Sequence, residues 1–144
     1  PRGEYTKNNF VDTRVFSLKK PLPLLSFFEY MVLLCDFFQK YKNQLELELL
    51  SNNTWLDRPL ISCDVQLPSM AVCGHLKGYK SHHVLIFGPE ELAFLQEIEE
   101  KKRKERLHLL ITKQTPFIII TSKSLLFREL EEICQQCSVP LFFS

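Results

Sequence analysis

The stretch "PFIIITSKSLLFRELEEICQQCSVPLFFS", residues 116–144, places a helical pattern between two apolar segments. Residues 116–122 form a continuous apolar run of strand length, which is typical of a strand covered on both faces. Residues 125–137 follow with one apolar stripe at helical spacing, made of Leu126, Leu130, Ile133 and Cys137. The closing residues, VPLFFS, predict another strand. Strand, helix and strand in this order require a right-handed crossover, so the two strands are expected to be parallel and adjacent or nearly adjacent.

Three more strand patterns precede this unit. Residues 45–49, LELEL, alternate strictly between apolar and acidic side chains, which predicts a half-buried strand. Residues 60–65, LISCDV, and residues 83–88, HVLIFG, are rich in β-branched and aromatic side chains and predict two further strands. The stretch SNNTWLDRP between the first two has turn chemistry, and Pro59 disfavours a helix just before it.

Two further helices are predicted, near residues 32–43 and 89–104. The first has apolar residues at helical spacing. The second begins with Gly88-Pro89-Glu90-Glu91, where proline fits the first turn and the glutamates suit the positive end of the helix dipole. The charged run 97–106 looks basic but carries opposite charges four residues apart, so we expect a solvated helical face rather than a nucleic-acid site. The three expected pairs are Glu97–Lys101, Glu99–Arg103 and Glu100–Lys104.

These patterns predict one α/β domain over residues 32–144, with a mixed β-sheet of about five strands flanked by helices. Residues 1–31 are predicted to be an N-terminal extension that is poorly ordered, and Met31 is a candidate start of the folded unit. The apolar stretch 21–38 is not expected to enter a membrane, because two prolines and the charges of Glu29 and Asp36 interrupt it. The length of 144 residues fits a single domain.

Net charge and cysteine content argue against a nucleic-acid-binding, a membrane-binding and a secreted disulfide-rich protein. The formal net charge is +1, so no strong field attracts nucleic acid or anionic lipid. The five cysteines are odd in number and scattered, whereas a secreted disulfide framework usually has an even set. Reduced thiols in a cytoplasmic protein are therefore expected.

Residues 74–81, GHLKGYKS, resemble a phosphate-binding loop only superficially. Such a loop needs four residues between its glycines, a lysine directly after the second, and a helix that follows. Here three residues separate Gly74 from Gly78, Tyr79 precedes Lys80, and a strand pattern follows. We expect no catalytic residue and no nucleotide site in this chain.

No metal site is predicted either. Cys134 and Cys137 lack a second cysteine pair and lie at the C-terminal end of the predicted helix, whereas redox-active pairs use a helix N-terminus to lower the thiol pKa. His82 and His83 are neighbours, so in a strand they would point to opposite faces. A buried thiol beside a surface thiol, with ordinary histidines, is the simpler interpretation.

Asp57, Arg58 and Asp64 form the one candidate site, a turn that could face a ligand or a partner. The alternative interpretation makes both aspartates local turn caps and Arg58 a surface ion partner. We favour the second interpretation, because side-chain capping by aspartate is common in turn-rich segments.

The sequence resembles the N-terminal domain of bacterial HPr kinase/phosphorylase. The likeness covers about residues 32–144 and consists of short matches in order. They are Arg58-Pro59-Leu60, Asp64-Val65, Pro68, Gly74, Gly88, Glu91-Leu92, Phe94-Leu95 and residues 116–121. Three positions depart from the family pattern: Leu67 stands where arginine is usual, Ser69 where glycine is usual, and His75 where tyrosine is usual.

The resemblance implies a non-catalytic regulatory or assembly domain. The parent enzyme of the family phosphorylates a serine of the phosphocarrier HPr, in regulation of the sugar phosphotransferase system, and also reverses the reaction. Its C-terminal domain carries the phosphate loop and uses ATP or pyrophosphate with Mg²⁺. The resemblance therefore implies a C-terminal kinase domain and HPr as partners, and a homo-oligomer, a hexamer, in the full-length protein.

The residues of this chain contain no phosphate loop, so we expect no activity from it alone. A free-standing domain of the same superfamily, binding a small molecule or another protein without kinase activity, is the alternative. The sequence beyond Ser144 distinguishes the two.

Overall fold

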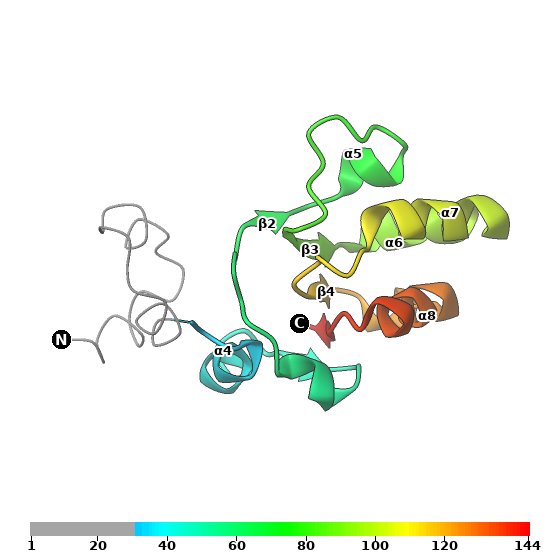
Figure 1. Ribbon diagram of the computed structural model, residues 1–144. Helices are drawn as coiled ribbons and strands as arrows, with labels where there is room; N and C mark the ends of the chain where they lie inside the picture. Colours follow the sequence, from blue (N-terminus) through cyan, green and yellow to red (C-terminus); the bar gives the residue numbers. More distant parts are fainter. Residues whose placement is uncertain (1–30) are drawn as a thin grey trace.

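The computed structural model describes residues 31–144 (Figure 1). The predicted poorly ordered extension and the first part of the apolar stretch 21–38 lie outside the described residues. The described part contains five strands, five α-helices and two short 3₁₀ turns. In chain order they are α4 (Leu34–Tyr41), β1 (Glu48–Leu49), η1 (Asn53–Leu56), β2 (Val65–Gln66), α5 (Ser69–Val72), β3 (Val84–Phe87), α6 (Pro89–Glu97), α7 (Glu100–Leu110), β4 (Ile118–Ile120), η2 (Lys123–Leu125), α8 (Arg128–Cys137) and β5 (Leu141–Phe143).

The strands form one mixed sheet in the order β1-β5-β4-β3-β2. β2, β3, β4 and β5 are parallel, and β1 pairs with β5 in the antiparallel direction. The crossover predicted from residues 116–144 is present: β4 and β5 are adjacent and parallel, with Ile118 opposite Leu141. The prediction of an α/β domain with a five-stranded mixed sheet is confirmed.

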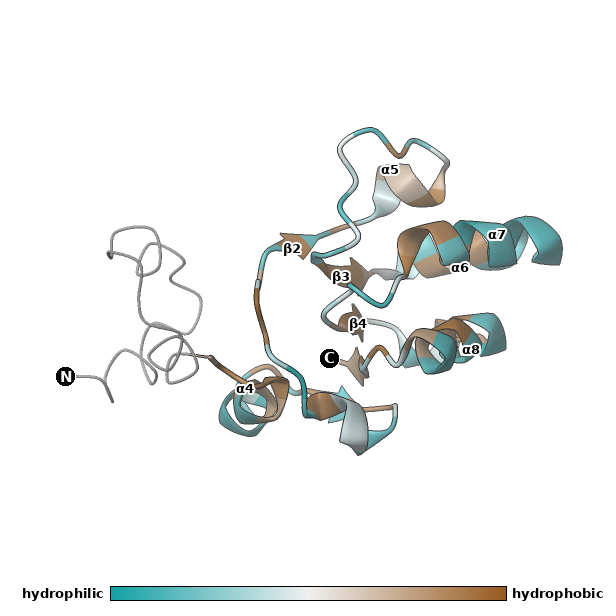
Figure 2. Ribbon diagram, in the orientation of Figure 1, coloured by the Kyte–Doolittle hydropathy of each residue, from teal (hydrophilic) through white to brown (hydrophobic). Residues whose placement is uncertain are grey.

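Helices cover both faces of the sheet. Figure 1 shows α5, α6, α7 and α8 on one face and α4 on the other. The larger core lies under the four helices and contains Leu85, Phe87, Ile118 and Ile120, all of them buried. In Figure 2 the strands are coloured as hydrophobic, whereas the outer sides of α7 and α8 are coloured as hydrophilic.

The second core lies between the sheet and α4. The ring of Phe38 lies 5.3 Å from that of Phe142, and the ring of Phe37 lies 5.5 Å from that of Phe117. Leu34 is fully buried at the start of the helix. These contacts explain the apolar face of α4. An isolated helix of this length is unstable in water, so α4 depends on packing against the sheet.

The helix predicted over residues 89–104 is two helices, which corrects the prediction. The backbone is extended at Ile98, with ψ of 154°, and a new helix begins at Glu100 and runs to Leu110. A straight helix from Pro89 to Leu110 would be about 33 Å long at 1.5 Å per residue, far longer than the three- and four-residue strands beneath it. The break lets both halves pack their leucines on the same small sheet.

The edge strands are shorter than predicted. β1 contains only Glu48 and Leu49, because a turn occupies residues 42–46 and Glu46 has a left-handed φ of 52°. Residues 60–64 of the second predicted strand lie before the sheet, and pairing with β3 begins only where the amide of Val84 donates to the carbonyl of Asp64 at 2.8 Å. α5 and η1 lie in segments for which no helix or strand was predicted. The last helix, predicted from residue 125, begins only at Arg128, and η2 ends at Leu125.

Candidate functional site

The candidate turn lies at the amino-terminal edge of the parallel strands. The backbone amide of Leu34 donates to the carbonyl of Arg58 at 2.9 Å, and the amide of Leu60 donates to the carbonyl of Val32 at 2.8 Å. These two bonds fix the segment that leads toward β2. Arg58 thus occupies a defined position next to the loop that precedes β4.

Among the described residues, Arg58 has no ion partner, which corrects the interpretation favoured by the sequence. Its Nη1 donates to the carbonyl oxygens of Thr115, at 3.3 Å, and Pro116, at 3.2 Å. The side chain is partly buried, and burial lowers the pKa of the guanidinium from its ordinary value. The arginine therefore joins two loops that are 57 residues apart in the sequence, through neutral carbonyl groups rather than through a carboxylate.

The two aspartates lie on either side of this arginine and do not converge with it. Asp57 is exposed and follows η1, where its amide donates to the carbonyl of Thr54 at 3.4 Å. Asp64 is also exposed; its carboxylate accepts from Ser62 Oγ at 3.2 Å and lies 3.9 Å from His83 Nε2. The structure therefore separates the three residues of the predicted turn, and Asp64 belongs to a small polar cluster of its own.

A groove of about 570 Å³ opens beside Arg58. Three loops line it: residues 58–62 before β2, His82 before β3, and residues 113–116 before β4. We call it the Arg58 groove. Its members from the second and third loops were missed by the sequence analysis, because only the parallel order of the strands brings these loops together.

Residues 74–81 form a loop and a turn that lead into β3, as their spacing predicts. Gly74 and Gly78 both adopt positive φ, of 107° and 80°, which is accessible to glycine at little cost. Arg106 of α7 lies against Gly74 and donates to the carbonyl of Val72, and Tyr79 OH donates to the carbonyl of Leu110. These contacts give the loop a packing role against α7.

The start of α6 is capped from within the chain. Glu91 is nearly buried, and its Oε2 accepts from the amide of Gly88 at 2.9 Å. Ser69 Oγ of α5 donates to the other carboxylate oxygen. The positive end of α6 is therefore occupied by a carboxylate of its own first turn. Sequence analysis placed Glu91 there but missed its partner in α5.

The cysteine pair lies at the C-terminal end of α8, as predicted. Cys134 is buried, and burial raises the pKa of its thiol to about 12, while Cys137 is half-buried. His82 and His83 have their ring centroids 4.8 Å apart. Within residues 31–144, no group of three or more potential metal ligands comes together.

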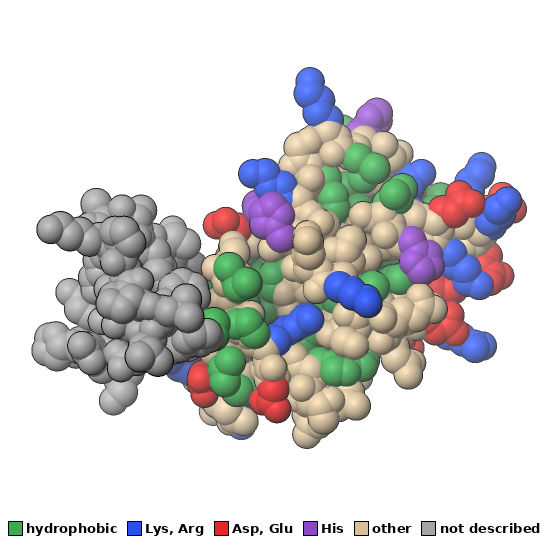
Figure 3. All heavy atoms as spheres, in the orientation of Figure 1, with side chains coloured by type: hydrophobic (Ala, Val, Ile, Leu, Met, Phe, Trp, Pro, Cys, Tyr) green, Lys and Arg blue, Asp and Glu red, His purple; other side chains and the backbone are tan. Residues whose placement is uncertain are grey.

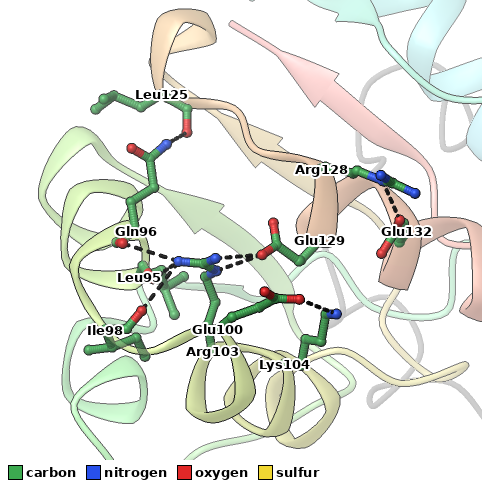
Figure 4. Close-up of polar contacts among 10 residues, drawn as sticks. All are labelled: Leu95, Gln96, Ile98, Glu100, Arg103, Lys104, Leu125, Arg128, Glu129 and Glu132. Carbon is green, nitrogen blue, oxygen red and sulfur yellow. Dashed lines mark hydrogen bonds and ion pairs between the residues drawn. The ribbon is translucent and has the colours of Figure 1, made fainter.

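Acidic and basic side chains are interspersed over α7 (Figure 3), and besides Arg106 a second arginine of this helix, Arg103, packs inward. Arg103 donates to Glu129 of α8 and to the carbonyl oxygens of Leu95, Gln96 and Ile98 at the end of α6 (Figure 4). Of the three pairs predicted on this helix, Glu100–Lys104 is the one that the described residues form. Glu99 lies before α7 begins, and Arg103 pairs with Glu129 of α8 instead.

Comparison with known proteins settles the family. The family model described as HPr Serine kinase N terminus matches residues 34–144. The chain belongs to this family. The matched segment begins at the first residue of α4 and includes every strand of the sheet.

Three relatives named HPr kinase/phosphorylase illustrate the similarity. The protein of Exiguobacterium sp. (strain ATCC BAA-1283 / AT1b) is 32% identical over 96 residues, which are 67% of this chain and 31% of the relative. That of Bacillus velezensis is 32% identical over 101 residues, 70% of this chain and 33% of the relative. That of Bacillus subtilis (strain 168) is 30% identical over 101 residues with the same coverage. The chain thus spans about a third of the length of these relatives.

The structure also locates the three departures from the family pattern. Leu67 is exposed on the segment after β2, His75 is exposed after α5, and Ser69 donates to Glu91. The contact of Ser69 with Glu91 is one that glycine, the residue that the resemblance leads us to expect at this position, could not make.

Proposed function

We propose that residues 32–144 are a non-catalytic regulatory or assembly domain of an HPr kinase/phosphorylase. The observation that carries the proposal is the family match over residues 34–144, in a chain that spans about a third of relatives with that name. The parent protein would phosphorylate and dephosphorylate a serine of HPr and so regulate the sugar phosphotransferase system. ATP and Mg²⁺ would bind in its C-terminal kinase domain.

The site chemistry of the described residues supports a non-catalytic role. Phosphoryl transfer needs backbone amides around the phosphates, a lysine directed at them, and side chains that hold Mg²⁺. The helix start that follows a glycine here, at Gly88, is occupied by the carboxylate of Glu91. Lys80 and Ser81 precede a strand rather than a helix, so they do not lie at a helix N-terminus.

The location and assembly of the protein belong to the same proposal. We propose a cytoplasmic protein that assembles, through its kinase domain and this domain, as a homo-oligomer, with six subunits in the full-length form. In the described part of the chain, no helix has the length and apolar character to cross a membrane. The formal net charge of +1 supports neither nucleic acid nor a membrane surface as a partner.

The test uses the complete gene product with purified HPr, ATP and Mg²⁺. We expect serine phosphorylation of HPr by the complete protein. Removal of residues 31–144 should leave the chemical step measurable and alter its regulation or the subunit number. A matched comparison is the complete protein with Glu91→Ala, which alters this domain locally and leaves the remainder of the chain unchanged.

Two results would contradict the proposal. If the truncated protein kept its fold and lost all chemistry, this domain would contribute to catalysis. If the gene encoded no phosphate loop after Ser144, the second candidate would stand, a free-standing binding domain of the same superfamily. The Arg58 groove is the observation that favours this second candidate.

A further inference from the structure

The Arg58 groove has rigid walls. Thr115 is fully buried, and its Oγ1 donates to the carbonyl of Ser81 at 2.9 Å while it accepts from the amide of Thr112 at 3.1 Å. The loop before β4 is therefore bonded to the loop before β3. Arg58 bonds the same loop to the segment before β2, through the carbonyls of Thr115 and Pro116. A groove fixed by such bonds loses little conformational freedom when a ligand enters.

The fully charged side chains that line the groove, Arg58 and Lys113, are both basic. Its lining includes Arg58, Lys113 and His82, and no aspartate or glutamate among the described residues lines it. Arg58 uses only Nη1 for its two carbonyl partners, and every buried side-chain nitrogen and oxygen in residues 31–144 has a partner. Nε and Nη2 of Arg58 bond to no group of residues 31–144 and are therefore at least partly accessible. This edge of a guanidinium presents two parallel N–H groups, the geometry that binds a carboxylate or a phosphate through two hydrogen bonds.

The remaining lining is apolar and of ligand size. Pro59, Ile61 and Pro116 contribute hydrocarbon surface, and Ile61 is 87% exposed. The volume of about 570 Å³ lies within the range of small-molecule sites, which are mostly apolar with a few fixed polar groups. The combination favours a molecule with an anionic group and an organic body.

One carboxylate lies near the rim. Asp64 accepts a hydrogen bond from Ser62 Oγ at 3.2 Å, and Ser62 lines the groove. The negative charge of Asp64 would repel an anion bound near Ser62, so the anionic group of a ligand should lie toward Arg58 and Lys113. Removal of the Asp64 charge should therefore strengthen anion binding, whereas removal of a basic charge in the groove should weaken it.

We propose that the Arg58 groove binds a small organic anion, with its carboxylate or phosphate held by Arg58 and Lys113 and its body against Pro59, Ile61 and Pro116. The inference is independent of the proposed function, because it holds whether or not the chain regulates a kinase.

The experiment is an amide-shift titration of the ¹⁵N-labelled 144-residue chain at low ionic strength. Benzoate, phenyl phosphate and benzamide are the probes: they share a ring and differ in the polar group. We expect saturable shifts at the amides of Ile61, Ser62 and Gln114, with dissociation constants of roughly millimolar for at least one anion. Neutral benzamide should bind at least about tenfold more weakly. The stronger of the two anions identifies the class of ligand.

Variants locate the charge that matters. Lys113→Gln should weaken binding about threefold to tenfold, whereas Lys101→Gln on α7, away from the groove, should leave it unchanged. Asp64→Asn should tighten binding about twofold to threefold. Arg58→Gln should abolish anion binding. Because this variant also loses the two hydrogen bonds to Thr115 and Pro116, the Lys113 and Asp64 variants decide the test.

Several outcomes would overturn the proposal. They are the absence of saturable shifts with both anions, equal binding of benzamide, and equal effects of Lys113→Gln and Lys101→Gln. Binding of an acidic peptide such as hexaglutamate at these amides, without binding of the small anions, would also overturn it and would assign the groove to a protein partner. None of these results bears on phosphorylation of HPr by the complete gene product.

Discussion

Ser69 Oγ donates a hydrogen bond to the carboxylate of Glu91, and the same carboxylate accepts from the amide of Gly88. The two contacts join α5 to the first turn of α6 over a sequence separation of 22 residues. A Cβ at position 88 would lie 2.8 Å from Glu91 Oε2, so any other residue there would require this carboxylate to shift. The side chain of Glu91 thus caps α6 and joins it to α5.

Glu91→Ala is expected to lower the free energy of unfolding by about 2 kcal/mol, because it removes a capping acceptor and leaves two donors without their partner. The measurement is urea unfolding of the 144-residue chain followed by circular dichroism. Glu90→Ala is the matched control, since Glu90 is exposed in the same turn and should cost less than about 0.5 kcal/mol. Equal losses for the two variants would show that the carboxylate of Glu91 has no special role.

Gly88→Ala is expected to cost at most about 1 kcal/mol, since the new methyl group must shift the flexible end of the Glu91 side chain and weaken its hydrogen bonds. The backbone at position 88 has φ of −79°, so the cost comes from the contact and not from the backbone conformation. A double-mutant cycle checks this account: with Glu91→Ala already present, Gly88→Ala should cost much less. Additive losses would mean that the two positions do not interact.

Central and local features of this fold could be predicted from sequence, and edge and long-range features could not. β3 and β4 lie inside continuous apolar runs, which indicate a strand buried on both faces whatever surrounds it. The limits of β1 and β2 depend on how many of their residues pair with β5 and β3, and no local sequence pattern contains that information. The break at Ile98 is accompanied by contacts of Arg103 with Glu129, 26 residues away, which no local pattern predicts.

The same reasoning applies to the candidate site. The sequence identified Arg58 as a residue of interest because it stands in a turn with a family match. Its partners at Thr115 and Pro116 follow only from the parallel order of β2, β3 and β4. The spacing argument against a phosphate loop at residues 74–81 needed no tertiary information, because the amide pattern of such a loop is local.

Arg103→Gln is expected to destabilise the fold by about 2 kcal/mol near neutral pH, because it leaves a partly buried carboxylate without its cation. Burial would by itself raise the pKa of Glu129, but the hydrogen bond and charge of Arg103 outweigh it and hold that pKa below its ordinary value of 4.5. A depressed pKa in the folded state gives stability that is present above the ordinary value and lost as the pH falls through the folded one. The difference between wild type and variant should therefore shrink below about pH 4.5.

Urea unfolding at about pH 7 and at about pH 3 measures this difference. Arg128→Gln is the control, since its pair with Glu132 is largely exposed and should contribute less than about 0.5 kcal/mol at either pH. A difference between wild type and Arg103→Gln that stayed constant with pH would mean that the ion pair does not set the pKa of Glu129.

The five thiols should differ widely in reactivity. Cys73 is exposed, whereas burial raises the pKa of Cys63 to about 11 and that of Cys134 to about 12. Because the thiolate is the reactive form, a disulfide reagent at about pH 8 should modify Cys73 first and Cys134 only on unfolding. Peptide mass spectrometry identifies the modified residues over time, and Cys73→Ser should remove the fast phase. Modification of Cys134 at the rate of Cys73 would contradict the burial of Cys134 in the core.

The last prediction is that this chain does not bind Mg-ATP with useful affinity. A phosphate site at a helix start needs free backbone amides and a positive local field. At α6, Pro89 has no amide hydrogen, the amide of Gly88 already donates to Glu91, and Glu90 adds a second negative charge. Lys80 and Ser81 lie in the loop that leads into β3, so their side chains are not presented with a cradle of amides. Isothermal calorimetry of the 144-residue chain with Mg-ATP should therefore show no saturable heat at high micromolar nucleotide. A one-site isotherm abolished by Lys80→Gln, but not by the control Lys77→Gln, would show that residues 74–91 hold a phosphate in a form that neither the loop spacing nor the capped helix start predicts.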